Sequence, residues 1–243
     1  MTTNPEILIE GSYLYYQKGV NYSQENFKLV QFKDSHTYHI YSEILSRIES
    51  GEFLKIMVRY EMDHHFHPVF VRVEKSLGNN YCQEVFKFDP VAQELHYTFQ
   101  NSNTTQDFKR PLAARHYITT PAFATSAIFT LTKKIDAIGR TAVSFFSSIN
   151  DWTYEHPPED KVVFAEFKTR EVPDFKINNS PLSASHLCLY EFDSSSAAIE
   201  SPVEIFVSKH YAIPYQMVHG DQSIVITNMK RNNWKHFYLL WSF

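Results

Sequence analysis

The residues best suited to chemistry in this sequence are histidines, and their densest group is Asp63-His64-His65-Phe66-His67, directly before Pro68. On an extended segment Asp63, His65 and His67 point to the same side. Imidazole and carboxylate groups are ligands that suit Zn²⁺, so these three residues are candidate metal ligands. Together with His64 they are also the residues that an enzyme on the same scaffold would use. No second ligand group stands at a recognised spacing. We favour a polar turn and expect no metal.

The two cysteines, Cys82 and Cys188, lie far apart in the sequence and neither belongs to a Cys-x-x-Cys motif. Each lies in a strand-like run of apolar residues. Because an unpaired cysteine behaves as a small hydrophobic residue, we expect two buried free thiols. A single disulfide between them is the alternative.

Motifs for nucleophilic or phosphate chemistry are missing from the sequence. There is no Gly-x-Ser-x-Gly motif and no pair of glycines spaced for a phosphate-binding loop. Ser183 and Ser185 precede His186, but adjacency in sequence is not triad geometry. Glu155 and the pair Glu159–Asp160 flank a proline-containing loop and indicate a solvated acidic surface. We therefore expect no catalytic residues and no cofactor, and lean against an enzyme.

The composition excludes several other classes of protein. The 243 residues carry a net charge of −4, 16% are aromatic, and only 6 are glycine. Average usage predicts roughly 17 glycines in a chain of this length. Abundant aromatic residues and a low net charge argue against intrinsic disorder. The basic residues are scattered, so we expect no nucleic-acid partner.

The elements that must position any site are β-strands, because short β-branched and aromatic runs alternate with polar residues and end at turn residues. Turns are predicted at Gly51, Gly78 and Gly220. The expected strands are Ser12–Gln17, Phe27–Lys33, His36–Arg47, Glu52–Glu61, Val69–Lys75, Tyr81–Asp89, Glu94–Gln100, Lys161–Thr169, His186–Phe192, Val203–Ser208, Pro214–Val218, Ser223–Asn228 and Lys235–Trp241.

One segment departs from this pattern and predicts a helix over about residues 121–135. Phe123, Ala127 and Leu131 recur at helical spacing, with Thr120 suited to the N-cap and Pro121 to the first turn. The expected fold is mainly β: a single strongly curved antiparallel sheet or barrel of about 11 to 13 strands around this one helix. Residues 1–243 are expected to form one domain, with the two sheet halves 1–118 and 140–243 joined by the helix.

Aromatic residues occupy both faces of several strands, which is typical of strands that are covered on both sides or that line a cavity. A tyrosine-rich wall can bury its rings and still hydrogen-bond a polar head group. We therefore predict a protein that binds a hydrophobic or amphiphilic, lipid-like ligand. A plain, thick core is the alternative. The predicted ligand-binding residues are Tyr13, Tyr15, Phe86, Phe88, Phe164 and Tyr215.

The two ends of the sequence carry further expectations. The first residues show neither a charged n-region nor an apolar core, so no secretory signal is predicted and we expect a cytoplasmic protein, with export by a signal-less route as the alternative. No run approaches the ~18 apolar residues of a membrane span. The aromatic segment Trp234–Phe243 predicts a closing strand or docked segment. Alternatively it binds a protein partner, which would make the chain a structural or host-interaction module.

The order of elements resembles uncharacterised bacterial proteins related to the periplasmic lipoprotein-carrier half barrel. The residues that carry the resemblance are the tyrosine-rich run Gly11–Gly19, the central segment after Pro121 and the late hairpin Tyr211–Met217. The resemblance implies a curved antiparallel sheet with a concave apolar surface for lipid-like ligands. It transfers no functional residue, and the loop Asp151–Asp160 has no counterpart in the family.

Overall fold

The protein folds mainly as one large, open β-sheet. In a computed structural model the residues described are 5–112, 116–132, 139–191, 202–209 and 211–232. They contain one 15-stranded sheet with the strand order β8-β7-β6-β5-β4-β3-β2-β1-β17-β16-β15-β14-β11-β10-β9, and a two-stranded ribbon, β12-β13. Every neighbouring pair described in the large sheet is antiparallel except β9 and β10, which are parallel.

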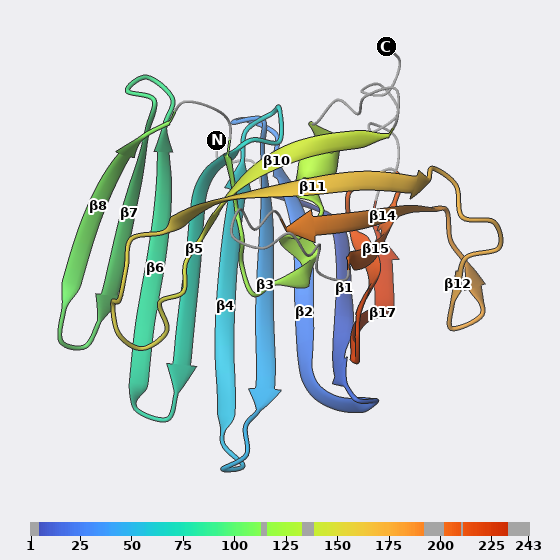
Figure 1. Ribbon diagram of the computed structural model, residues 1–243, viewed down its shortest axis with the longest axis horizontal. Coiled ribbons are helices and arrows are strands. Elements are labelled where there is room, and N and C mark those ends of the chain that lie inside the picture. The colour runs from blue at the N-terminus through green and yellow to red at the C-terminus, as the bar shows by residue number, and fades with distance from the viewer. Residues whose placement is uncertain (1–4, 113–115, 133–138, 192–201, 210, 233–243) are drawn as a thin grey trace.

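The first half of the chain forms the upright strands of Figure 1, and the second half returns to pair with the first strand. The strands of the large sheet are β1 (Glu6–Gln17), β2 (Val20–Phe32), β3 (Thr37–Arg47), β4 (Phe53–Met62), β5 (Pro68–Leu77), β6 (Asn80–Asp89), β7 (Glu94–Asn101), β8 (Thr105–Pro111), β9 (His116–Ile118), β10 (Arg140–Ser147), β11 (Glu159–Thr169), β14 (Ala184–Glu191), β15 (Val203–Ser208), β16 (Pro214–His219) and β17 (Gln222–Arg231).

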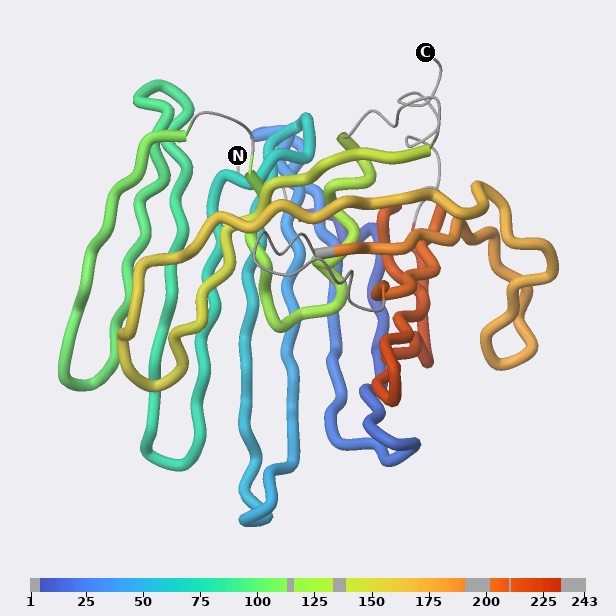
Figure 2. The backbone as a smooth tube through the Cα atoms, in the orientation of Figure 1, coloured from blue at the N-terminus to red at the C-terminus, as the bar shows by residue number. Residues whose placement is uncertain are grey.

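The sheet curls so that its two ends face each other across the core. The strands β10, β11 and β14 cross in front of the upright strands, and the short β9 lies against β5 on the inner side (Figures 1 and 2). The ribbon of β12 (Lys176–Ile177) and β13 (Ser180–Pro181) extends to one side. The fully buried side chains lie between the upright strands and the strands that cross them. The inner surface of the sheet is therefore concave and apolar.

The two ends of the sheet are joined by side chains and not by backbone hydrogen bonds among the described residues. Arg110 on β8 pairs with the Asp160 carboxylate on β11, and His116 Nε2 on β9 lies 3.2 Å from the other oxygen of that carboxylate. The His116 ring also stacks on Phe146, with ring centroids 4.5 Å apart. The described part of the sheet is thus barrel-like in outline but open.

The period-two pattern correctly predicts most strands, but β1 begins at Glu6 and not at Ser12, and β2 begins at Val20 and not at Phe27. The 3 glycines predicted in hairpin turns are there, all with positive φ: Gly51 at 86°, Gly78 at 55° and Gly220 at 59°. The strand count exceeds the expected range, because β8, β9, β10 and the small ribbon were not predicted. The expected strand Lys235–Trp241 and the docking role of Trp234–Phe243 fall outside the described residues.

The predicted α-helix over residues 121–135 is wrong for its described part. Two short 3₁₀-helices occupy the segment, η1 (Phe123–Thr125) and η2 (Ile128–Leu131). The threonine hydroxyls supply the reason: Thr125 Oγ1 donates to the Ala122 carbonyl at 2.8 Å, and Thr130 Oγ1 donates to the Ala127 carbonyl at 2.7 Å. Such local bonds compete with continuous α-helical bonding. Residues 133–135 lie outside the described part.

Candidate functional site

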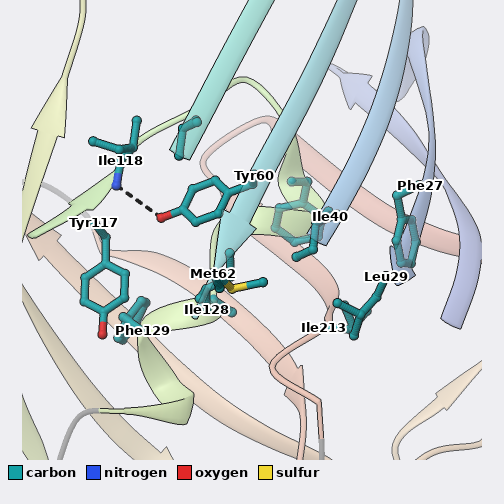
Figure 3. Close-up of a cluster of buried hydrophobic side chains, with 14 of the residues drawn as sticks. Phe27, Leu29, Ile40, Tyr60, Met62, Tyr117, Ile118, Ile128, Phe129 and Ile213 are labelled. Atoms are coloured by element: carbon teal, nitrogen blue, oxygen red, sulfur yellow. Dashed lines mark hydrogen bonds between the residues drawn. The ribbon is translucent and has the colours of Figure 1, made fainter. Parts of the chain in front are cut away.

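The concave face is built from rows of side chains that run across neighbouring strands. Because side chains alternate along a strand, every second residue of β2 to β8 points inward. The core continues across β9, η2 and the loop after β15, as Figure 3 shows for Tyr60, Met62, Ile128 and Ile213. One complete cross-strand row consists of Leu29, Ile40, Tyr60, Val71, Phe86, Tyr97 and Phe108.

Three of the predicted ligand-binding residues lie near one another, Tyr13 and Tyr15 on β1 and Tyr215 on β16, with β17 between these two strands in the sheet. Tyr13 is fully buried and donates from its hydroxyl to the Pro214 carbonyl oxygen at 2.8 Å. Its ring stacks on Phe27 at a centroid distance of 5.0 Å. Tyr215 is also buried, and its hydroxyl accepts a hydrogen bond from Arg231. Burial raises the pKa of both Tyr13 and Tyr15 well above the usual value. The phenols of Tyr13 and Tyr15 therefore stay neutral and act as hydrogen-bond donors.

The other three predicted residues do not share one place. Phe86 is buried, and its ring lies 4.9 Å from that of Tyr97, so it lines the concave face on β6. Phe88 is partly buried and packs against the edge of the same core. Phe164 on β11 is 43% exposed, on the face of that strand opposite to the buried Ala165. Phe164 therefore does not line the interior.

A buried carboxylate that the sequence analysis did not single out lies beside Tyr15. Glu25 on β2 is fully buried, and both of its oxygens accept hydrogen bonds. Tyr15 Oη donates at 2.5 Å and Ser42 Oγ at 2.7 Å. The backbone N–H groups of Phe123 and Ala124 donate at 2.9 and 3.3 Å. Glu25 thereby fastens η1 to the sheet.

Burial raises the pKa of the Glu25 carboxyl above its ordinary value, although the hydrogen bonds to this carboxylate act in the opposite direction and lower it.

Tyr15 also holds the 119–132 segment, which covers the inner face of the sheet, because the Phe123 N–H donates to Tyr15 Oη at 3.1 Å. The 119–132 segment has no strand partner beyond the Thr119 N–H bond to the Phe146 carbonyl. Side-chain hydrogen bonds are therefore its main polar link to the upright strands.

A second buried carboxylate lies four strands away, on β6. Glu84 is 4% exposed and points inward between Val73 and Phe99. Its Oε1 accepts a hydrogen bond of 2.7 Å from Tyr97 Oη. That hydroxyl in turn accepts one of 2.8 Å from the Asn150 side-chain amide. Burial and the Glu84 charge raise the pKa of Tyr97, so this phenol also stays protonated.

Asn150 organises the 148–158 loop that covers this end of the concave face. Its side chain donates to the His156 carbonyl and accepts from the N–H groups of Glu155 and His156. The loop is tied to the sheet by Asn101, whose side-chain amide donates to the Trp152 carbonyl at 2.8 Å. The loop is thus ordered by one buried asparagine and contacts β5 and β7.

The cysteines are buried free thiols, as predicted. Burial raises the pKa of Cys82 to about 11, and burial also raises the pKa of Cys188. Cys188 Sγ lies 3.9 Å from His186 Nε2, and the same nitrogen lies 3.3 Å from Glu204. A nucleophile–base–orienter relay needs the two ring nitrogens of histidine to have different partners. This group is therefore not a catalytic triad.

The histidine-rich segment forms a polar turn between β4 and β5. Asp63 Oδ1 accepts the backbone N–H groups of His65 and His67 at 2.8 and 2.9 Å, which closes the turn. The rings of His64 and His65 lie against each other at 3.8 Å. Among the described residues, no group of three or more histidine, cysteine or acidic side chains is placed to hold a metal ion.

The remaining polar candidates are also separated. Ser185 Oγ donates to the Arg170 carbonyl and is not aimed at a histidine. Both oxygens of the Asp160 carboxylate have partners, Arg110 and His116.

Among the described residues, no helix is long and apolar enough to cross a bilayer.

Comparison with known proteins gives similarity of fold alone. No family model and no curated protein matches the sequence. The structure is similar to the β-barrel-like protein of the domain of unknown function DUF1849 from Brucella abortus, with a TM-score of 0.57 and 10% identity over 94% of this chain and 98% of that one. It is also similar to a DUF1089 family protein from Pseudomonas aeruginosa, with a TM-score of 0.49 and 11% identity over 79% of this chain and 87% of that one.

Both buried carboxylates have a signal in the sequence, which is their position on an apolar strand face and not a motif. Period two places Glu25 on the same face as Phe27, and it places Glu84 on the same face as Cys82 and Phe86. A carboxylate on an apolar face needs donors, which identifies it as a special position. Asn150 carries no such signal, because the loop around it has no period.

Proposed function

We propose that this protein is a non-enzymatic binding protein for a hydrophobic or amphiphilic, lipid-like small molecule. The observation that supports it is the largely apolar concave face, whose buried polar side chains on the described upright strands are phenols, serines and the two carboxylates Glu25 and Glu84. An amphiphile is the ligand class that combines apolar area with one polar group. The ligand lies between the concave face and the two segments that cover it.

The covering segments suit reversible opening. The 119–132 segment and the 148–158 loop are irregular, and each is held to the upright strands by side-chain hydrogen bonds and apolar contacts. Irregular segments of this kind separate from a sheet at lower free energy than its central strands do. We infer that the ligand enters when one of them lifts.

The open, barrel-like sheet is the scaffold that the resemblance to lipoprotein-carrier half barrels implies, and it fits this function. The likeness to the Brucella abortus protein supports the fold and adds no ligand. Our proposal for the ligand class therefore rests on the concave face itself.

The direct test is native mass spectrometry of the purified protein, with solvent extraction and lipid analysis of the same sample. We expect a co-purifying amphiphile at up to one equivalent. Extracted protein should then bind a fluorescent fatty-chain probe in a saturable way. A protein that carries no guest and binds no probe would refute the proposal.

Two matched variants locate the bound probe. Val73→Phe adds bulk on the concave face of β5, whereas Val85→Phe adds the same ring on the opposite face of β6. We expect at least tenfold weaker probe binding in the first variant and none of this loss in the second. Overpacking costs about 1–3 kcal/mol of stability, so both variants are checked by thermal unfolding. Equal binding by both would place the probe elsewhere.

A further inference from the structure

The two buried carboxylates on the concave face differ in how completely they are hydrogen-bonded. Glu25 receives four donors, shared between both oxygens. Glu84 receives one, from Tyr97 to Oε1, and the described residues provide no donor to Oε2. Glu84 Oε2 is not sealed from solvent, because it is not among the buried side-chain atoms that lack a hydrogen-bond partner. Glu25 is saturated, whereas Glu84 has an acceptor to spare.

The Lys75 ammonium group at this end of the concave face is bound to the 148–158 loop. Lys75 Nζ donates to the Asn150 carbonyl and to Asp151 Oδ1, both at 2.8 Å, and it forms no ion pair with Glu84. The Tyr97 hydroxyl is held on its other side by Asn150. Among the described residues, the second oxygen of Glu84 therefore has no donor and is not sealed from solvent, so it is open to a further hydrogen bond.

Covering a carboxylate oxygen without giving it a donor is costly, because a charged acceptor then loses its water. A ligand that lies over Glu84 and brings a donor to Oε2 avoids that cost. A ligand that brings a second anion adds charge repulsion at short range in a poorly screened place. The position thus distinguishes ligands by the sign and hydrogen-bonding character of their polar group.

We propose that Glu84 binds the polar end of the ligand, and that this end is a hydrogen-bond donor, an amine or a hydroxyl, and not a carboxylate or phosphate. Tyr97 and Asn150 position the carboxylate, and the apolar tail lies along the neighbouring inward side chains of Val71, Val73 and Phe86. This inference rests on the proposed function, because it names the polar end of the same ligand.

The test is a headgroup series on one tail: dodecylamine, dodecanol and dodecanoate, titrated against extracted wild-type protein below their micelle-forming concentrations. We expect the amine, the alcohol or both to bind at least tenfold more tightly than the carboxylate. Tighter binding of the amine alone assigns a cationic headgroup, and similar binding of amine and alcohol assigns a neutral donor. Equal affinity for all three, or a preference for the carboxylate, overturns the inference.

The variant Glu84→Gln removes the charge and keeps the shape. We expect it to reduce the preference for the amine over the carboxylate at least tenfold, while Glu74→Gln, on the outer face of β5, keeps the wild-type preference. An unchanged preference in Glu84→Gln overturns the inference even if binding persists. If that variant does not fold, the wild-type series still decides. Failure of all three probes to bind refutes the proposed function as well, whereas binding without selectivity refutes this inference alone.

Discussion

Glu25 links stability to pH through its buried carboxyl. Burial raises its pKa above the ordinary value of 4.5, so the folded state binds the proton more tightly than the unfolded chain. The contribution of Glu25 to the free energy of unfolding is therefore lowest above the folded pKa, and it rises as the pH falls from that pKa to about 4.5. The sign is opposite to that of a salt-bridged carboxylate.

The corresponding prediction compares wild-type protein with Glu25→Gln, in which the group does not titrate. As the pH is lowered through this window, the free energy of unfolding of wild-type protein should increase relative to the variant. Urea unfolding at a series of pH values measures the difference. Glu43→Gln, at a surface ion pair with Lys55, is the control. A wild-type-minus-variant difference that stays constant with pH would contradict the expectation.

Gly11 marks a position on β1 where the backbone of β17 and an aromatic ring come close together. A Cβ atom at Gly11 would lie 2.6 Å from the Asn228 carbonyl oxygen and 2.7 Å from the Phe27 ring. We predict that Gly11→Ala lowers the free energy of unfolding by about 1–3 kcal/mol, as overpacking does. Ser12→Ala, at the partly exposed next residue, should change it by less than about 0.5 kcal/mol. Denaturant unfolding of both variants is the measurement.

At the scale of elements, the 148–158 loop should depend on Asn150. Removing this buried side chain leaves the N–H groups of Glu155 and His156 without their acceptor. Each such hydrogen bond contributes about 0.5–1.5 kcal/mol to stability. We predict that Asn150→Ala speeds amide hydrogen exchange in the loop at least tenfold and leaves the β3–β4 hairpin unchanged.

The control for this prediction is Asn103→Ala, which removes an exposed asparagine from the β7–β8 turn. Its hydrogen bond to Asn101 uses the backbone N–H, which alanine retains. Exchange in the 148–158 loop should match that of wild-type protein. Loop exchange that stays slow in Asn150→Ala would show that apolar contacts, such as Tyr154 with Phe99, hold the loop.

Strands with a strict apolar and polar alternation could be predicted from the sequence, and those without it could not. β2 to β7 are predicted because their inward residues are nearly all apolar. β8 (Thr105–Pro111) is an edge strand, and Phe108 is its one inward apolar residue. The alternation that predicts a strand is therefore missing from it. The helical spacing of Phe123, Ala127 and Leu131 arises from two separate 3₁₀ turns that face the same core. Local pattern cannot distinguish these from one helix.

The candidate site was predicted only in part, for a similar reason. Tyr13, Tyr15, Phe86 and Tyr215 lie inside because they share the inward face of their strands. Phe164 has the same residue type but the opposite parity on β11, and the register of that strand depends on partners far away in the chain. Which aromatic residues share an interior is decided by sheet curvature, which one sequence does not reveal.

At the scale of the whole molecule, β8 and β9 end the sheet, and β8 leaves one row of backbone groups without a strand partner among the described residues. Charged side chains and proline protect such edges from pairing with other chains. On β8 these are Asp107, Lys109 and Pro111. We predict that the double variant Asp107→Val, Lys109→Val self-associates in a concentration-dependent way, measured by sedimentation velocity.

The control places the same number of valines on a strand that is paired on both sides. Gln83→Val with Lys87→Val changes the outer face of β6, which lies between β5 and β7. This variant should remain as dispersed as wild-type protein. Equal association of both variants would attribute the effect to surface hydrophobicity and not to the free edge.

The pairing of β1 with β17 has a kinetic consequence. The centre of the sheet joins residues such as Ser12 and Thr227, which are 215 positions apart. During synthesis, β1 has its β2 partner early, but its other edge stays unpaired until β17 leaves the ribosome. Contacts so distant in sequence make folding slow. Refolding should therefore be limited by docking of the returning half of the chain, and a circular permutant that makes β17 and β1 consecutive should refold faster.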